Sequence, residues 1–240
     1  MIELRPFSRL GRFDYDWLTA RYHFSFADYH DRHRMHWGAL RVWNDDRIAP
    51  GGGFARHGHS DMEIVTYIRK GAITHRDHLG NEGRTVAGDV QVMSAGRGIL
   101  HEEHNFEAEP TELFQIWILP AEKGGAPYWE TAEFPKDDRK GRLVPLASGR
   151  PGDEGALPIR QDAAILGARL APGDEVVHKL APGRFAYLVA AAGTVTVNGV
   201  ALGTRDAAAI HEEDEITIVV PADAAEDAEI VLADVPPLMR

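Results

Sequence analysis

The chain has 240 residues, of which 44% are hydrophobic and 26% are charged, as is usual for a soluble globular protein. It contains no cysteine, which excludes disulfides, thiolate metal sites, iron–sulfur clusters and a cysteine nucleophile. Its 37 acidic and 26 basic residues leave a net charge of −11, which disfavours direct binding to nucleic acid. The first residues lack the apolar core of a signal peptide, and no apolar run reaches the roughly 20 residues of a membrane span, so we expect a cytoplasmic protein without membrane contact.

Short β-type runs separated by Gly, Pro, Asp and Asn turns dominate the chain, which predicts an all-β fold. The predicted strands, in chain order, are residues 38–44, 63–69, 90–94, 113–119, 163–170, 186–190, 194–197, 215–220 and a last one near 229–233. The run Asn44-Asp45-Asp46 is expected to form a turn. No long segment has a period of 3.6, so helix is expected only as short turns near residues 14–18 and 127–131.

A polar segment rich in Pro and Gly, residues 134–155, resembles a connection between two units. The pattern of residues 67–74 partly returns beyond it, in residues 187–190 and 193–196. Two divergent copies of one barrel explain this repeat economically. We therefore predict a first barrel over residues 1–133, a linker over 134–160, and a second barrel over 161–240.

Two histidine-bearing clusters suggest a metal site. Side chains two apart in a strand share a face, so His57 and His59 can point the same way, with Glu63 in phase. Further along the chain, His101 and Glu103 have the same i, i+2 spacing. Imidazole and carboxylate donors suit a borderline divalent metal and leave room for water, oxygen or substrate. The two pairs together therefore predict one mononuclear metal centre.

The remaining histidines are interpreted as structural or exposed. Surface or loop positions are expected for His23, His30, His33 and His36, and exposed hairpin positions for His75 and His78. His104 directly follows Glu103 and is expected to point to the opposite face of its strand. In the second unit His178 has no partner cluster, so no metal is expected there.

The segments LRVWNDDRIAPGGGFARHGHSDMEIVTYI and GDVQVMSAGRGILHEEHN closely resemble the pirins, a branch of the cupin superfamily. The resemblance implies a bicupin, with two double-stranded β-helix barrels in one chain. It also implies that the metal ligands are His57, His59, His101 and Glu103, and it leaves Glu63 to the barrel wall or the surroundings of the ligands. The proline usual in the second cupin motif is replaced by Ser94.

This resemblance further implies an oxidoreductase, because quercetin 2,3-dioxygenase activity is reported for members of the family. The substrates would be a small planar aromatic compound and O₂, and Glu103 would take the proton of the flavonol hydroxyl as a general base. One divalent ion is expected: Fe(II) first, because nitrogen and oxygen donors with open positions suit oxygen chemistry, with Ni, Co, Mn, Cu and Zn also compatible.

Two other hypotheses stay open at this point. The first is a non-enzymatic protein that senses a metal or its redox state and acts through a protein partner, with Arg32-His33-Arg34 as the contact to test. The second keeps an enzyme but gives it another enol-like or hydroxylated ring compound as natural substrate, since one scaffold hosts many chemistries.

Overall fold

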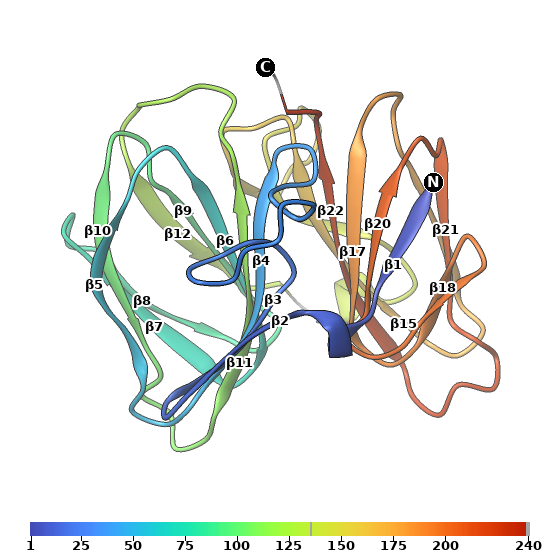
Figure 1. The fold of residues 1–240 in the computed structure, drawn as a ribbon, viewed down its shortest axis with the longest axis horizontal. Coiled ribbons are helices and arrows are strands. Elements are labelled where there is room, and N and C mark those ends of the chain that lie inside the picture. Colours follow the sequence, from blue (N-terminus) through green and yellow to red (C-terminus); the bar gives the residue numbers. More distant parts are fainter. Residues whose placement is uncertain (135, 239–240) are drawn as a thin grey trace.

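The computed structural model describes residues 1–134 and 136–238 of the chain. Two β-barrels lie side by side, and each is built from a seven-stranded and a four-stranded sheet (Figure 1). The all-β fold and the two-barrel plan expected from the sequence are therefore confirmed. No helix in the described residues is long and apolar enough to cross a membrane.

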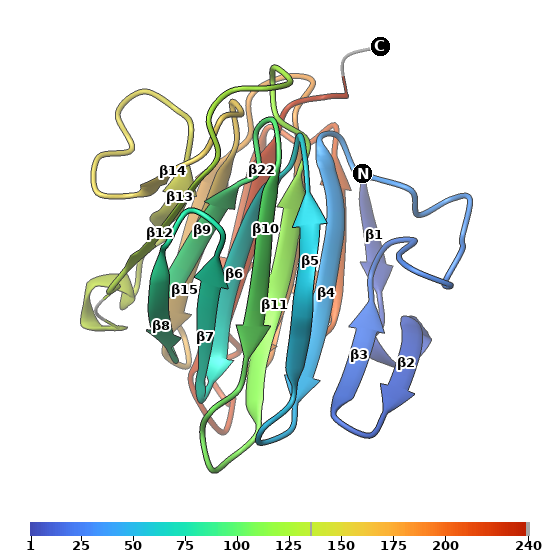
Figure 2. The same ribbon diagram turned by 90° about the vertical axis from the view of Figure 1, so that its left-hand side faces the viewer.

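The first barrel combines a seven-stranded sheet, order β12-β9-β6-β11-β4-β3-β2, with a four-stranded sheet, order β5-β10-β7-β8. The strands of the larger sheet are β12 (Tyr128–Ala132), β9 (Val90–Ser94), β6 (Glu63–Lys70), β11 (Thr111–Ile118), β4 (Leu40–Ile48), β3 (Leu18–Tyr22) and β2 (Gly11–Tyr15). Those of the smaller sheet are β5 (Gly53–His59), β10 (Ile99–His104), β7 (Ala72–Asp77) and β8 (Glu82–Val86). Figure 2 faces this smaller sheet, in which β10 runs between β5 and β7.

The second barrel repeats the plan with the sheet orders β1-β20-β17-β22-β15-β13-β14 and β16-β21-β18-β19. The strands of its larger sheet are β1 (Ile2–Arg5), β20 (Ala207–His211), β17 (Phe185–Ala192), β22 (Ala228–Val235), β15 (Ala164–Leu170), β13 (Val144–Ser148) and β14 (Leu157–Pro158). Those of the smaller sheet are β16 (Glu175–Lys179), β21 (Glu215–Val219), β18 (Val195–Val197) and β19 (Val200–Leu202). Two short 3-10 helices, η1 (Phe7–Arg9) and η2 (Lys136–Arg139), join strands.

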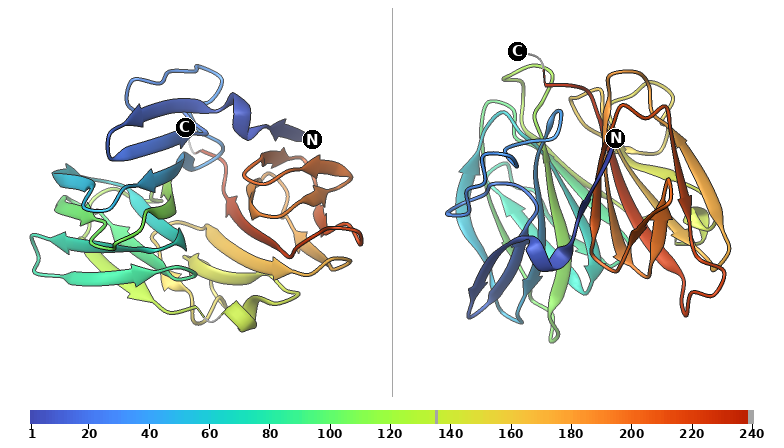
Figure 3. Two further views of the ribbon diagram at one scale, coloured as in Figure 1. Left: turned by 90° about the horizontal axis from the view of Figure 1, so that it is seen from below. Right: turned by 45° about the vertical axis from the view of Figure 1, so that its right-hand side comes forward.

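The strand pairing differs from the predicted division of the chain in two places. Strand β1 pairs with β20, so the chain starts in the second barrel and crosses to the first (Figure 3). Strand β13, inside the predicted linker 134–160, pairs with β15. The two segments pair at opposite sides of the second barrel's larger sheet, where β20 and β15 would otherwise be open edges.

The two larger sheets pack on each other through one hydrophobic core. Trp43 and Phe114 of the first barrel belong to the same buried cluster as Tyr187 and Val231 of the second. The interior of the second barrel is filled by a separate aliphatic cluster that includes Leu188 and Ile216. Apolar filling of this kind stabilises the barrel by burial, and it leaves the polar interior to the first barrel.

All nine predicted strands exist, with boundaries shifted by a few residues. The two predicted helical turns are wrong. Residues 14–18 close the β2–β3 hairpin, in which Tyr15 pairs with Leu18, and residues 127–131 lie mostly in β12, which pairs with β9. Backbone pairing with a neighbouring strand overrides weak local preference in both places.

The predicted turn at Asn44-Asp45-Asp46 is also wrong, because these residues lie within β4 and are buried. The Asp45 carboxylate is compensated by Arg69 and by Arg205, whose Nε lies 2.6 Å from Asp45 Oδ2. Charged residues at the centre of a strand are stable only with such partners, and the partners lie far away in sequence.

Candidate metal centre

The register of β10 with its two neighbours determines the candidate site. His101 lies opposite His57 in the β10–β5 pair, and Ile99 lies opposite His59. A bulge follows His101, and Glu103 then pairs with His75 of β7 on the other side. Because alternate residues of a strand share a face, His57, His59, His101 and Glu103 all reach the interior of the first barrel.

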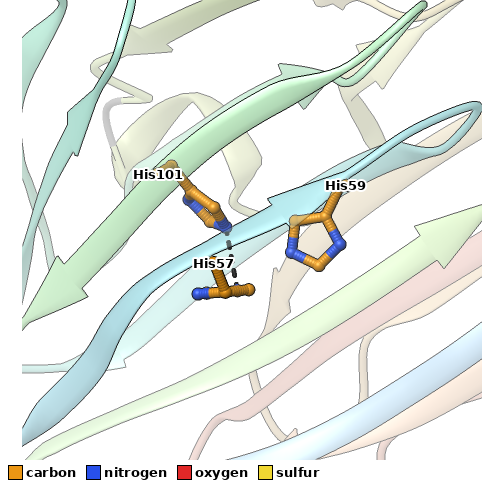
Figure 4. Close-up of side chains that lie close together, drawn as sticks. All are labelled: His57, His59 and His101. Carbon is orange, nitrogen blue, oxygen red and sulfur yellow. Dashed lines mark hydrogen bonds between the residues drawn. The ribbon is translucent and has the colours of Figure 1, made fainter.

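Three imidazoles meet there, as Figure 4 shows for His57, His59 and His101. Their ring centroids are 4.5 Å apart for His57 and His101, 4.8 Å for His57 and His59, and 5.0 Å for His59 and His101. One nitrogen of each ring lies within 4.8 Å of the other two. The structure thus brings together the three histidines that the sequence predicted as ligands.

The protonation of these rings leaves lone pairs for a cation. His57 Nδ1 lies 2.7 Å from the carbonyl oxygen of Ala55, so Nδ1 donates its proton, and in the neutral ring Nε2 carries the lone pair. Burial first, and then the neighbouring imidazoles, lower the pKa of His101 to about 3 and that of His59 to about 4. Both rings are therefore neutral at neutral pH and can act as ligands.

The distance between one nitrogen of His57 and one of His101 fits two ligands of one metal ion. His57 Nε2 and His101 Nε2 are 3.2 Å apart. Two adjacent nitrogen ligands at about 2.1 Å from one ion, with an angle of about 90–110° between them, are separated by about 3.0–3.4 Å. The arrangement therefore suits a bound divalent metal.

Glu103 lies close to His101 but is not part of the three-histidine group. Its carboxylate belongs to a second group, in which the donor atoms of His75, His101 and Glu103 lie within 4.8 Å of one another. Gln115 Nε2 donates to Glu103 Oε2 over 2.7 Å, and Gln91 Nε2 donates to Oε1. These amides extend from the opposite sheet and hold the carboxylate toward His101, which is common to both groups.

Glu63 lies away from these donors, in the barrel wall. Its Oε1 accepts a hydrogen bond of 2.7 Å from Ser94, and its Oε2 accepts one of 3.1 Å from the backbone N–H of Arg160. Burial raises the pKa of Glu63, against the effect of these hydrogen bonds. The residue joins β6 and β9 to the second half of the chain and does not contribute to the histidine cluster.

His75 is a residue of the site that the sequence interpretation missed, because its predicted exposure is wrong. Its ring is completely buried and stacks on Trp129, with centroids 4.7 Å apart and planes at 6°. The sequence feature that could have predicted its burial is the alternation along β7, where Ile73 and His75 are both buried and share a face.

His23 lies in the loop after β3, within the predicted class of surface or loop positions, but it is not exposed. It is buried between the barrels, and its Nδ1 lies 2.9 Å from the Tyr187 hydroxyl. His30, His33, His36 and His78 are exposed, as expected.

A cavity of about 380 Å³ opens beside the three histidines. About half of its lining is aromatic or aliphatic and the rest is polar: Trp17, Leu18, Tyr22, Phe26, Asn44, Asp46, Phe54, Ala55, His57, His59, Ile64, His101, Glu103, Gln115 and Trp117. A compartment that combines apolar and aromatic walls with directed polar groups is typical of a small-molecule site.

The β4 wall of this cavity carries two oxygen atoms without partners. Asp46 Oδ1 and Asn44 Oδ1 are buried and have no hydrogen-bond partner among the described residues. Burial, followed by the charges of Asp45 and Glu103, raises the pKa of Asp46 well above its usual value. This wall therefore offers polar groups that a bound molecule could satisfy.

In the second barrel, His178 is hydrogen-bonded to Asp234. Its Nε2 lies 2.7 Å from Asp234 Oδ2, and the buried Asp234 also accepts hydrogen bonds of 2.6 Å from Arg184 and Arg150. Burial opposes ionisation of Asp234, but the hydrogen bonds from His178 and Arg150, the charge of Arg150 and the hydrogen bond from Arg184 together lower its pKa to about 2. The described residues that could group around a metal lie in the first barrel.

Comparison with known proteins identifies relatives along the whole chain. The family model described as Pirin matches residues 3–118, and one described as Quercetinase C-terminal cupin domain matches residues 146–235. A pirin-like protein of Caulobacter vibrioides is 59% identical over 98% of this chain and 99% of its own length. A quercetin 2,3-dioxygenase of Escherichia coli is 39% identical over 99% of this chain and its entire length.

Solved structures are also similar to the whole chain. The crystal structure of YhhW from Escherichia coli superimposes with a TM-score of 0.92 at 38% identity and covers all of both chains. The structure of the bacterial pirin YhhW from Escherichia coli in complex with nickel(II) has a TM-score of 0.90 at 38% identity, and covers 99% of this chain and 100% of that one.

Proposed function

The chain belongs to the pirin family of cupin proteins, and we propose that it is a metal-dependent dioxygenase that opens the heterocyclic ring of a flavonol such as quercetin with O₂. The observation that carries the proposal is the convergence of three imidazoles at one wall of a cavity that aromatic side chains help to line. The name of the Escherichia coli relative supports the reaction type.

We assign His57, His59, His101 and Glu103 as the ligands of one divalent ion. Fe(II) is the first choice, because nitrogen and oxygen donors with open positions suit oxygen chemistry. The same donors fit Co, Mn, Cu and Zn, and the nickel(II) complex of a relative supports Ni as well. When bound, the ion supplies a Lewis acid and a template that orients the substrate oxygens.

The residues of the chain provide binding, orientation and proton transfer. Phe26, Phe54 and Trp117 line the cavity and would pack on the planar rings and exclude water. Glu103 would accept the proton of the 3-hydroxyl as a general base. Gln91 and Gln115 donate to its two oxygens and so restrict the orientation of the carboxylate. Both atoms of O₂ enter the opened product, and one ring carbon leaves as carbon monoxide.

The test is oxygen uptake with quercetin by protein that has been stripped of metal and reloaded with Fe(II). We expect uptake accompanied by carbon monoxide, and we expect Glu103→Gln to lose both while Glu102→Gln, at the adjacent position in β10, retains them. A filled site that leaves quercetin untouched in air would overturn the flavonol proposal. It would favour another hydroxylated ring compound or a regulatory role through a protein partner.

A further inference from the structure

We propose that Asp77 and His75 form a hydrogen-bonded chain that fixes the tautomer of His101 and thereby presents His101 Nε2 to the metal ion. His75 and Asp77 are positioning residues in this proposal, since they act through His101. The proposal rests on the metal-binding part of the proposed function and is independent of the substrate.

The hydrogen-bonded chain begins at the carboxylate of Asp77, which can only accept hydrogen bonds. Asp77 Oδ1 accepts hydrogen bonds from the backbone N–H groups of Leu79, at 2.9 Å, and Asn81, at 3.1 Å. Asp77 Oδ2 accepts a further one from the Asn81 side-chain amide over 2.9 Å. A carboxylate surrounded by these donors has no proton to give. His75 Nε2, which lies 3.1 Å from Asp77 Oδ2, must therefore be the donor.

This donor role determines the rest of the chain. A neutral imidazole with its proton on Nε2 has a lone pair on Nδ1, and His75 Nδ1 faces His101 Nδ1 at 3.4 Å. Only one of two facing nitrogens can carry the proton, so His101 is protonated on Nδ1. The lone pair of His101 is then on Nε2, the atom that lies 3.2 Å from His57 Nε2.

The surroundings of His75 favour this role over direct ligation. One of its nitrogens is bonded to Asp77 and the other faces His101, so neither is free for the cavity. The ring cannot turn easily, because it lies flat on Trp129 with centroids 4.7 Å apart. The side chains of His75 and Asp77 are both fully buried. Their hydrogen bonds are therefore protected from competition by water.

The strand register explains how the three residues meet. In the β10–β7 pair, His101 lies opposite Asp77, and Glu103 lies opposite His75. His75 is therefore diagonal to His101 on the same face, within reach of a ring nitrogen. The same strand that carries two proposed ligands is thus supported by two residues of its neighbour.

Removal of an outer hydrogen-bond partner of a histidine ligand typically weakens metal binding by about 10–100-fold. The experiment uses Zn(II), which is diamagnetic, as the probe for the full-length protein. Zinc affinity is measured by competition with a chelator for the wild type, His75→Phe, Asp77→Asn and the control His104→Phe. Long-range ¹H–¹⁵N correlation of the imidazoles in the zinc-loaded protein reports the tautomer of each ring.

We expect His75 to carry its proton on Nε2 and His101 to carry its own on Nδ1 with Nε2 bound to zinc. His75→Phe preserves a ring against Trp129, and together with Asp77→Asn it should bind zinc about 10–100-fold more weakly. His104→Phe, which alters a residue on the other face of β10, should bind like the wild type. Circular dichroism of each metal-free variant shows whether the fold is retained.

Two results would contradict the hydrogen-bonded chain without contradicting the proposed metal centre. One is a ¹⁵N shift that shows zinc bound to His75, and the other is unchanged zinc affinity in folded His75→Phe. A wild-type protein that binds no zinc at the histidines would overturn both. Neither result depends on quercetin or O₂, so failure of the flavonol reaction alone would leave this proposal intact.

Discussion

His101→Ala is the substitution with the largest expected effect on metal binding. His101 is central to the site, because it belongs to both groups of potential ligands and is only 3% exposed. A four-donor zinc site binds with about 10–16 kcal/mol, or about 2.5–4 kcal/mol for each donor. Loss of one donor should therefore weaken zinc binding by about 10²- to 10³-fold. The metal-free variant should remain folded, since the core between the barrels and the interior of the second barrel are untouched.

The assay is zinc titration followed by metal analysis after dialysis against a chelator. Zinc should also raise the thermal midpoint of the wild type, because a ligand that binds only the folded state stabilises it, and it should scarcely raise that of His101→Ala. The matched control is His178→Ala, which removes a histidine bonded to Asp234 in the second barrel and should leave zinc content unchanged. Full zinc retention by His101→Ala would mean that the ligands lie elsewhere and would refute the reasoning.

Three further results are expected. Since folding lowers the pKa of His59 and His101, the unfolded chain takes up their protons first as the pH falls. The metal-free protein should then lose stability from about pH 6.5 downward, by about 3 kcal/mol at pH 4 for His101; a flat urea-unfolding profile would contradict this. Asp234→Ala should lower the free energy of unfolding by about 3–5 kcal/mol, because it leaves Arg184 without its buried partner, while zinc affinity measured in parallel stays the same. Because folding raises the pKa of Asp46, its carboxyl favours folding less as the pH rises above the unfolded value. Asp46→Asn should therefore raise the thermal midpoint of the metal-free protein more at pH 8 than at pH 4, and an equal change at both pH values would argue against a raised pKa.

Local patterns were sufficient for much of the site. The i, i+2 spacing of His57 and His59 placed both on one face, and the same spacing placed His101 with Glu103. Alternation and turn residues also predicted the all-β class and the strands that contain long apolar runs. These features depend on the geometry of a single strand, which neighbouring residues determine.

Residue roles that depend on distant partners could not be predicted in this way. Whether His75 faces water or the interior depends on Trp129 and on the β10–β7 register. Asp45 looked like part of a turn because its compensating Arg205 is far along the chain, and β1 joined the second barrel because its pairing partner is β20. Spacing within a strand determines which side chains share a face, but only the packing of the sheets determines which face is buried and what it meets there.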